Sequence, residues 1–213
     1  MLLECRLYGI IDLGYIDIGD CNRIAEQMIE GGVDLIQLRG KNKSIDELAD
    51  IAAALHEITS RSSMPLIVND HAEVARKASV EGVHVGQDDD SIQVARRKTG
   101  CAVLVGKSTH SLEQARAARA EGADYIGFGP IFATPTKPDY APIGLSEIKN
   151  VHSDVTVPIF CIGGIKLDNL EEIIAAGAQR VAIVSGLLKA SDIIEYARAC
   201  KKLLTLKSAI RNP

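Results

Sequence analysis

Residues 30–39, E-G-G-V-D-L-I-Q-L-R, join the end of an expected helix to a short apolar strand. A Gly at a helix end relieves the left-handed cap, and the apolar run that follows is typical of a parallel strand covered on its outer face. The pattern returns as E-G-V-H-V-G-Q from Glu81, E-G-A-D-Y-I-G-F-G from Glu121 and A-G-A-Q-R-V-A-I-V-S from Ala176. This repeated unit decides the fold, because it predicts helices that alternate with parallel strands.

Similar strand signals lie between these units, at residues 7–12, 66–69, 102–105 and 159–162. The intervening segments mostly have apolar residues at helical spacing, and the segment 44–58 also begins with a capping box of Ser44 and Glu47. Strands and helices that alternate in this way predict an α/β protein, a (β/α)8 TIM barrel, as a single domain over residues 1–213. A doubly wound sheet is the alternative. Only the tail, at about 207–213, is expected to fray.

The composition narrows the class of protein. A chain of 213 residues that is 46% hydrophobic can bury a substantial core in one domain. Its net charge of -4 and its scattered Lys and Arg residues argue against a nucleic-acid partner. Glu4 and Arg6 interrupt the region where a signal peptide needs apolar residues, and no window reaches about 18 apolar residues, so no membrane partner is expected.

The five cysteines are odd in number and have no C-x-x-C spacing, which argues against disulfides and a zinc site. They are interpreted as small buried hydrophobes in a reducing compartment. The expected location is therefore cytoplasmic. The sequence leaves the oligomeric state open.

Polar residues follow the predicted strands, and in a (β/α)8 barrel the carboxyl ends of the strands form the working face. After the second strand, Gln37, Arg39 and Lys41 point to one side because side chains alternate along extended backbone. The other strand ends carry Asn69, Asp70 and His71; Gln87, Asp88 and Asp89; Ser108, Thr109 and His110; Gly163 and Gly164; and Val184 and Ser185.

The sixth predicted strand continues into a loop, Y-I-G-F-G-P-I-F-A-T-P-T-K at residues 125–137. Its Gly and Pro residues end the strand. Thr134 and Thr136 stand two residues apart, so their hydroxyls face the same way in extended backbone, and the Lys137 ammonium follows. Such donors suit a phosphorylated ligand, whereas the alternative is an ordinary Pro-rich surface loop.

Three cations, Arg39, Lys41 and Lys137, meet two carboxylates, Asp70 and Asp89, at one mouth of the predicted barrel. Magnesium is commonly held by one or two carboxylates together with substrate phosphates, which indicates a magnesium site at the aspartates. The alternative is that each Asp caps the helix that follows it. Arg and Lys both bind phosphate, although a strand-end cation can also be an ordinary rim charge.

The histidines and the last two strands give further candidates. His110 and His71 fit either acid–base chemistry or hydrogen-bonded structure, with structure favoured for His71. His84 lies inside an apolar run, so core packing is predicted for it. The ends of the seventh and eighth strands are where barrels frequently bind phosphate through backbone N–H groups.

These motifs, taken in order, resemble those of thiamine phosphate synthases over residues 8–188. The matching stretches are Q-L-R-G-K at 37–41, N-D at 69–70, G-Q-D-D at 86–89, S-T-H at 108–110, G-P-I-F-A-T-P-T-K at 129–137, and G-G at 163–164 followed by V-S at 184–185. The resemblance implies a transferase assisted by Mg²⁺. A hydroxymethylpyrimidine diphosphate would lose pyrophosphate, and the nitrogen of a thiazole phosphate would take the pyrimidine methylene.

The resemblance also implies roles for single residues of this chain. Those expected to hold the pyrimidine diphosphate are Gln37, Arg39, Lys41, Asn69, Ser108 and Lys137, of which Arg39, Lys41, Ser108 and Lys137 are the catalytic candidates. Those expected to hold the thiazole phosphate are Thr134, Thr136, Gly164, Val184 and Ser185. Asp70 and Asp89 are expected to ligate magnesium.

The sequence departs from this family at Gly40, where Glu is usual, at Lys107, where an apolar residue is common, and at Gly186, where Ala is usual. G-K-S-T-H-S and V-S-G-L also resemble the paralogous thiazole tautomerases, in which the His of this loop, here His110, acts in proton transfer. That paralogue has generally lost the pyrophosphate-binding residues, so their joint retention favours the synthase. A noncatalytic phosphate-ligand sensor is a third reading, disfavoured because a sensor has little reason to keep a magnesium pair.

Overall fold

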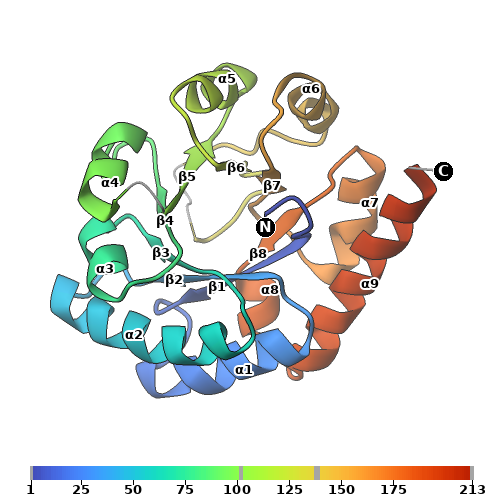
Figure 1. The fold of residues 1–213 in the computed structure, drawn as a ribbon. Coiled ribbons are helices and arrows are strands. Elements are labelled where there is room, and N and C mark those ends of the chain that lie inside the picture. The colour runs from blue at the N-terminus through green and yellow to red at the C-terminus, as the bar shows by residue number, and fades with distance from the viewer. Residues whose placement is uncertain (1, 101–102, 137–139, 212–213) are drawn as a thin grey trace.

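The computed structural model describes residues 2–100, 103–136 and 140–211, with 207–211 as backbone only. Within these residues eight strands form a closed parallel barrel in the order β1 to β8, and helices surround it (Figure 1). The strands are β1 Leu7–Asp12, β2 Leu35–Arg39, β3 Leu66–Asn69, β4 Gly82–Val85, β5 Leu104–Thr109, β6 Tyr125–Phe128, β7 Ile159–Cys161 and β8 Val181–Ile183. The α-helices are α1 Cys21–Glu30, α2 Ile45–Arg61, α3 Ala72–Lys77, α4 Ile92–Thr99, α5 Leu112–Ala120, α6 Ser146–Asp154, α7 Leu170–Ala175, α8 Ser185–Leu188 and α9 Ile193–Arg211, and 3-10 turns lie at Ile18–Asp20 and Leu167–Asn169.

The predicted barrel is confirmed, because β1 pairs in parallel with both β2 and β8. A doubly wound open sheet is therefore excluded. The strand expected at 102–105 lies instead at Leu104–Thr109, where it pairs along β4 and β6. Residues 101–102 are outside the described part of the chain.

The helix boundaries follow local chemistry where the sequence predicts it. Ser44 and Glu47 form the expected capping box: the Glu47 N–H donates to Ser44 Oγ at 3.3 Å, and the Ser44 N–H donates to Glu47 Oε2 at 3.0 Å. Helix α9 continues to Arg211, and residues 212–213 lie outside the described range, so the fraying of the tail stays a prediction.

Two apolar layers hold the barrel together. The larger one lies between strands and helices, with Met28, Leu48 and Phe128 fully buried in it. The smaller one fills the barrel interior, where the rings of Tyr8, Tyr125 and Phe160 meet edge to face with centroids 5.2 to 6.0 Å apart. Aromatic pairs of this geometry stabilise a core beyond simple burial. This aromatic cluster, called the aromatic floor below, lies beneath the carboxyl ends of the strands.

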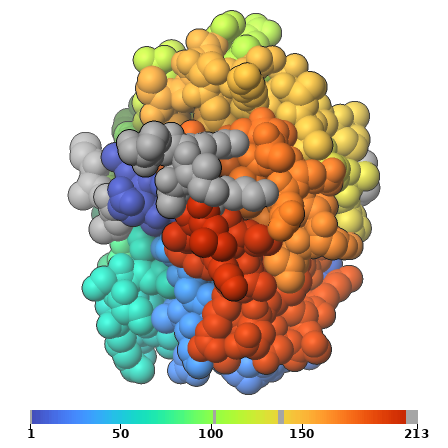
Figure 2. Space-filling view, turned by 90° about the vertical axis from the view of Figure 1, so that its right-hand side faces the viewer, coloured from blue at the N-terminus to red at the C-terminus, as the bar shows by residue number. Residues whose placement is uncertain are grey.

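Helix α9 covers the place where β8 returns to β1. It packs against α1, α7 and α8, and Figure 2 shows it in red between blue and orange segments. Ala197, Cys200 and Leu204, which are spaced three or four residues apart, are buried on its inner face, as expected of an amphipathic helix.

The cysteines inside the described ranges are buried, as expected of small hydrophobes, and burial raises the pKa of the Cys161 thiol to about 12. Cys101 lies outside those ranges. Among the helices described, none has the length and apolar character needed to cross a membrane.

Candidate active site

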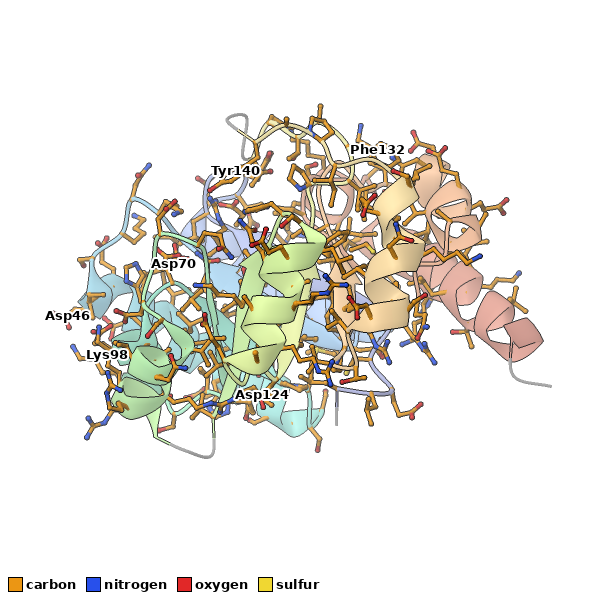
Figure 3. The ribbon with its side chains drawn as sticks, turned by 90° about the horizontal axis from the view of Figure 1, so that it is seen from above. Asp46, Asp70, Lys98, Asp124, Phe132 and Tyr140 are labelled. Atoms are coloured by element: carbon orange, nitrogen blue, oxygen red, sulfur yellow. The ribbon has the colours of Figure 1, made fainter. Side chains whose placement is uncertain are left out.

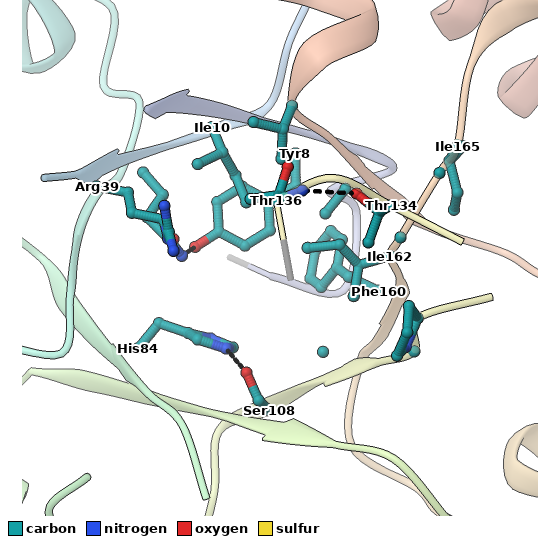
Figure 4. A pocket seen from close by; sticks show the side chains of 18 of the residues that line it. Tyr8, Ile10, Arg39, His84, Ser108, Thr134, Thr136, Phe160, Ile162 and Ile165 are labelled. Carbon is teal, nitrogen blue, oxygen red and sulfur yellow. Dashed lines mark hydrogen bonds between the residues drawn. The ribbon is translucent and has the colours of Figure 1, made fainter. Parts of the chain in front are cut away.

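A pocket opens at the carboxyl ends of the strands, above the aromatic floor (Figure 4). Figure 3 shows the barrel from the side, with Asp124 at the amino end of β6 and with Asp70, Phe132 and Tyr140 towards the opposite end. The pocket brings together most of the predicted substrate-binding residues: Gln37, Arg39, Asn69, Ser108, Thr134, Thr136, Gly164, Val184 and Ser185. Lys137 lies outside the described residues, so its position at the site stays a prediction.

Arg39 is held by a carboxylate that the sequence reasoning missed. Its Nη1 donates to Asp12 Oδ2 at 2.6 Å, and the Gly14 N–H donates to Asp12 Oδ1 at 2.9 Å. Asp12 is only 2% exposed, so this ion pair is largely removed from water. Asp12 could have been found as the last residue of β1, at the same barrel end as Arg39. The pairing fixes the guanidinium at the wall of the pocket.

Lys41, Asp70 and Asp89 lie within the described ranges and are not among the residues that line the pocket. Lys41 and Asp70 follow its lining residues Arg39 and Asn69 closely in the chain and contact each other. Lys41 Nζ lies 3.1 Å from Asp70 Oδ2, and the Asp70 side chain is 15% exposed. Asp70 has a φ of 65°, a left-handed conformation that is uncommon for a residue with a side chain. Strained backbone of this kind clusters at functional sites.

Asp70 also contacts Asp89, and this contact is the basis of the predicted metal site. Burial raises the pKa of Asp70, and the hydrogen-bonded, like-charged Asp89 raises it further against the lowering effect of Lys41. Two close carboxylates give a set of oxygen donors, the kind that magnesium prefers, with substrate phosphates and water completing its coordination. The residues present therefore fit magnesium. No group of three or more His, Cys, Asp or Glu side chains arranged as a metal site occurs within the described ranges.

The alternative role of the two aspartates, as helix caps, is contradicted. His71, not Asp70, is the N-cap residue of α3, and its side chain makes no capping hydrogen bond, so the role of this histidine stays a prediction. Ser91 caps α4, and its Oγ accepts the Val94 N–H at 3.3 Å. Asp89 accepts the Gly86 N–H at 2.7 Å and so shapes the turn after β4.

His84 is buried as predicted, but it also lines the pocket. Its Nε2 lies 3.0 Å from Ser108 Oγ (Figure 4). Its Nδ1 lies 3.2 Å from the Tyr125 hydroxyl. The Tyr125 hydroxyl is 3.1 Å from that of Tyr8, which accepts a hydrogen bond from Gln37 Nε2 at 2.6 Å. Burial raises the pKa of both tyrosines, so the phenols stay protonated. Two predicted substrate contacts, Gln37 and Ser108, are thus joined by one buried hydrogen-bond chain.

The departures from the family pattern have structural explanations. The buried Lys107 directs its Nζ to the Gly86 carbonyl at 2.6 Å, at the start of the loop that carries Asp89. A Cβ at Gly40 would meet the Leu13 and Leu48 side chains at 2.8 Å each.

Gly186 is the third departure, and it leaves room for Tyr196. A Cβ at this position would lie 2.7 Å from the Tyr196 hydroxyl. That hydroxyl accepts the Leu167 N–H at 2.7 Å, so the small residue at 186 allows α9 to brace the turn after β7.

The half of the pocket after β6 and β7 is built from hydroxyls and closely packed backbone. The Thr136 N–H donates to Thr134 Oγ1 at 3.4 Å. Gly163 and Gly164 have φ values of 100° and 64°, and a Cβ at Gly163 would lie 2.4 Å from Pro130. Glycine therefore allows the loop after β7 to pack against the loop after β6.

His110 lines the same pocket. Its Nδ1 is hydrogen-bonded to the Gly129 carbonyl, and its ring stacks on Tyr140 with centroids 4.3 Å apart. Because a carbonyl only accepts, Nδ1 carries a proton in this arrangement. The site therefore also contains His110, the residue on which the alternative function as a thiazole tautomerase depends.

The comparison with known proteins is decisive for the family. A family model described as thiamine monophosphate synthase matches residues 7–187. The chain belongs to the thiamine monophosphate synthase family. This member is 40% identical over 206 residues to a curated thiamine-phosphate synthase of Chloroflexus aurantiacus, covering 96% of this chain and 95% of the relative.

Two further relatives agree. A thiamine-phosphate synthase of Halalkalibacterium halodurans is 40% identical over 191 residues, covering 89% of this chain and 90% of the relative. A solved thiamine phosphate pyrophosphorylase from Pyrococcus furiosus superposes with a TM-score of 0.87 at 30% identity, covering 95% of this chain and 96% of that structure. The family predicted from the motifs is confirmed.

Proposed function

We propose that this family member is a thiamine-phosphate synthase, a transferase that joins hydroxymethylpyrimidine diphosphate and thiazole phosphate. The observation that carries the proposal is a group of charged residues beside the pocket: Arg39 in its wall, and Lys41 paired with Asp70, which follows the lining residue Asn69 and contacts Asp89. The relatives from Chloroflexus aurantiacus and Halalkalibacterium halodurans carry this activity in their names. The small-molecule substrates and the cytoplasmic location expected from the sequence are part of this proposal.

The charged half suits the diphosphate. In the reaction, the bond between the pyrimidine methylene carbon and the pyrophosphate oxygen breaks, and its electron pair leaves with pyrophosphate. Arg39 and Lys41 are placed to offset this negative charge as it develops, which lowers the barrier. Asn69 and Ser108 supply further hydrogen bonds from the pocket wall. When bound, magnesium supplies additional charge neutralisation for the leaving group, and Asp70 and Asp89 are the residues that would hold it.

The other half suits the thiazole phosphate, whose ring nitrogen supplies the lone pair for the new carbon–nitrogen bond. Thr134 and Thr136 offer hydroxyl donors, and Gly164 and Ser185 offer backbone N–H groups at the same pocket. A pocket that holds both substrates at once makes the reaction effectively unimolecular. No covalent intermediate with the protein is needed.

The test is a product assay with the purified protein, both phosphorylated precursors and magnesium. Thiamine phosphate and pyrophosphate should appear in equal amounts, and a chelator should lower the rate. His110 lines the pocket, so the isomerase alternative is tested in parallel with thiazole carboxylate tautomers. Tautomer interconversion without any thiamine phosphate would contradict the proposal.

Lys137, which the sequence places in the same site, is tested by Lys137→Ala. We expect lower turnover at limiting pyrimidine diphosphate, since a cation that contacts the diphosphate would be lost. Unchanged kinetics would remove Lys137 from the site.

A further inference from the structure

A second cavity, of about 570 Å³, lies beside the central pocket. Ser185 lines both cavities, and Pro135, between the two threonines of the β6 loop, lines the second one. Charged groups occur in its wall, namely Lys166, Asp168 and Lys189. The second cavity therefore adjoins the half of the site that is proposed to hold a phosphate.

Two sets of contacts connect Lys189 to the half of the pocket that is proposed to hold the thiazole phosphate. Its backbone N–H donates to the Ser185 carbonyl at 3.0 Å, so its side chain starts one helical turn after Ser185. Its Nζ lies 5.0 Å from the centroid of the Tyr15 ring, a cation–π contact. The Tyr15 hydroxyl lies 2.9 Å from Thr136 Oγ1. A lysine after α8, a tyrosine after β1 and a threonine after β6 thus form one connected row.

The residues assigned to the thiazole phosphate include no cation, and Lys189 can supply one. The groups assigned to the thiazole phosphate are hydroxyls and backbone amides, which carry no net charge. A phosphate monoester carries a charge of about −1.5 to −2 at neutral pH. Lys189 is exposed, and its flexible four-carbon stem lets the ammonium move between the Tyr15 ring and a bound anion.

We propose that Lys189 provides the cation that recognises the phosphate monoester of the thiazole substrate, and that Tyr15 is a positioning residue that holds Lys189 and the Thr136 hydroxyl at this subsite. The inference rests on the proposed function, since the phosphate concerned belongs to one of its substrates. It makes Lys189 a determinant of specificity for the phosphorylated over the unphosphorylated thiazole.

The first test is the steady-state kinetics of Lys189→Met. We expect the KM for thiazole phosphate to rise about tenfold, the loss of one charge-assisted contact. The KM for the pyrimidine diphosphate and the kcat at saturation should stay within about twofold of wild type, because Lys189 is not among the residues assigned to the leaving group. With the unphosphorylated thiazole alcohol, wild type and variant should have equal kcat/KM.

Two further variants distinguish recognition of the phosphate by Lys189 from a general effect of removing one positive charge. Lys189→Arg should restore most of the affinity. Lys202→Met, which removes an exposed lysine from α9, should behave as wild type. An unchanged KM for thiazole phosphate in Lys189→Met, or an equal rise in Lys202→Met, would overturn the inference.

Tyr15 is tested by two substitutions. Tyr15→Phe keeps the ring under Lys189 and removes the hydroxyl, so the KM for thiazole phosphate should rise about threefold, as expected of one neutral hydrogen bond. Tyr15→Leu removes both contacts and should have a larger effect on the same KM. Equal losses of kcat with both substrates would indicate a merely structural role.

The inference can fail separately from the proposed function. Calorimetry of thiazole phosphate binding to the wild type and to Lys189→Met needs no catalysis. Equal Kd values would contradict the role of Lys189 even if the wild type makes thiamine phosphate. Weaker binding to the variant would support that role even if the wild type makes none, in which case the proposed function alone would fall.

Discussion

The two halves of the pocket mouth use different chemistry on the same barrel. At the carboxyl ends of β1 to β4, charged side chains face one another, with Arg39 paired to Asp12 and Lys41 to Asp70. After β6 to β8, the groups are mostly hydroxyls and backbone around Gly164. A leaving pyrophosphate gains charge in the transition state, whereas the phosphate of the thiazole does not change. The difference teaches that several charges are concentrated where charge develops, whereas a phosphate that is only held is met mainly by neutral donors, with the flexible Lys189 proposed as the cation among them.

The largest loss of activity is expected from Asp70→Asn, which removes a negative charge from the charged half and leaves the other half unchanged. We expect kcat to fall on the order of 10²-fold, with a higher magnesium concentration needed for half-maximal rate, because a proposed metal ligand loses its charge. The melting temperature should change little, since His71 is the N-cap of α3. The measurement is turnover against magnesium concentration.

Asp88→Asn is the matched control for Asp70→Asn, since it removes an exposed carboxylate from the loop after β4. It should retain wild-type turnover. If Asp70→Asn kept its activity and lost only thermal stability, the carboxylate would be structural and the charged half would need another source of metal binding.

A smaller effect is expected from Asp12→Asn, which leaves Arg39 without its carboxylate. We expect the free energy of unfolding to fall by about 2 kcal/mol, less than for a fully buried pair because the Arg39 side chain is 14% exposed. Urea unfolding measures this loss. Added pyrophosphate should recover more stability in the variant than in the wild type, because the anion replaces the missing partner. Equal recovery in both proteins would show that Arg39 does not bind the anion.

The smallest effect is expected in the neutral half, from Gly186→Ala. The new Cβ would lie 2.7 Å from the Tyr196 hydroxyl and 3.0 Å from Ile183 Cγ2, so the variant should lose about 1 kcal/mol of stability through overpacking. Tyr196→Phe removes the clashing hydroxyl, so Gly186→Ala should cost less in that background. The same cost in both backgrounds would show that Tyr196 is not the reason for glycine at this position.

Much of the fold could be predicted from the sequence because strands such as β2, β6 and β8 are apolar runs that follow a left-handed glycine at a helix end, namely Gly32, Gly122 and Gly177. The site residues at the carboxyl ends of strands, such as Arg39, Asn69 and Ser108, were predicted for the same reason, and the structure places them at one pocket. The contacts that these residues make with one another were harder to predict, because they depend on which strands are neighbours and on the register between those strands.

His84 and Tyr15 illustrate this limit. His84 lies in an apolar run, and only the parallel register of β4 with β5 brings its ring to Ser108. Tyr15 lies in a loop with no recognisable motif and meets Thr136 across 121 residues of sequence. Contacts of this kind arise from barrel closure, so a pattern along the chain does not reveal them.

The most direct measurement of the central claim is a crystal structure of the protein with magnesium, pyrophosphate and thiazole phosphate bound together. The account predicts two separate anions: pyrophosphate with magnesium at Arg39, Lys41, Asp70 and Asp89, and the thiazole phosphate at Thr136, Gly164 and Ser185. Pyrophosphate bound instead at Thr136, Gly164 and Ser185, or both anions competing for one position, would contradict the division of the mouth into a charged half and a neutral half.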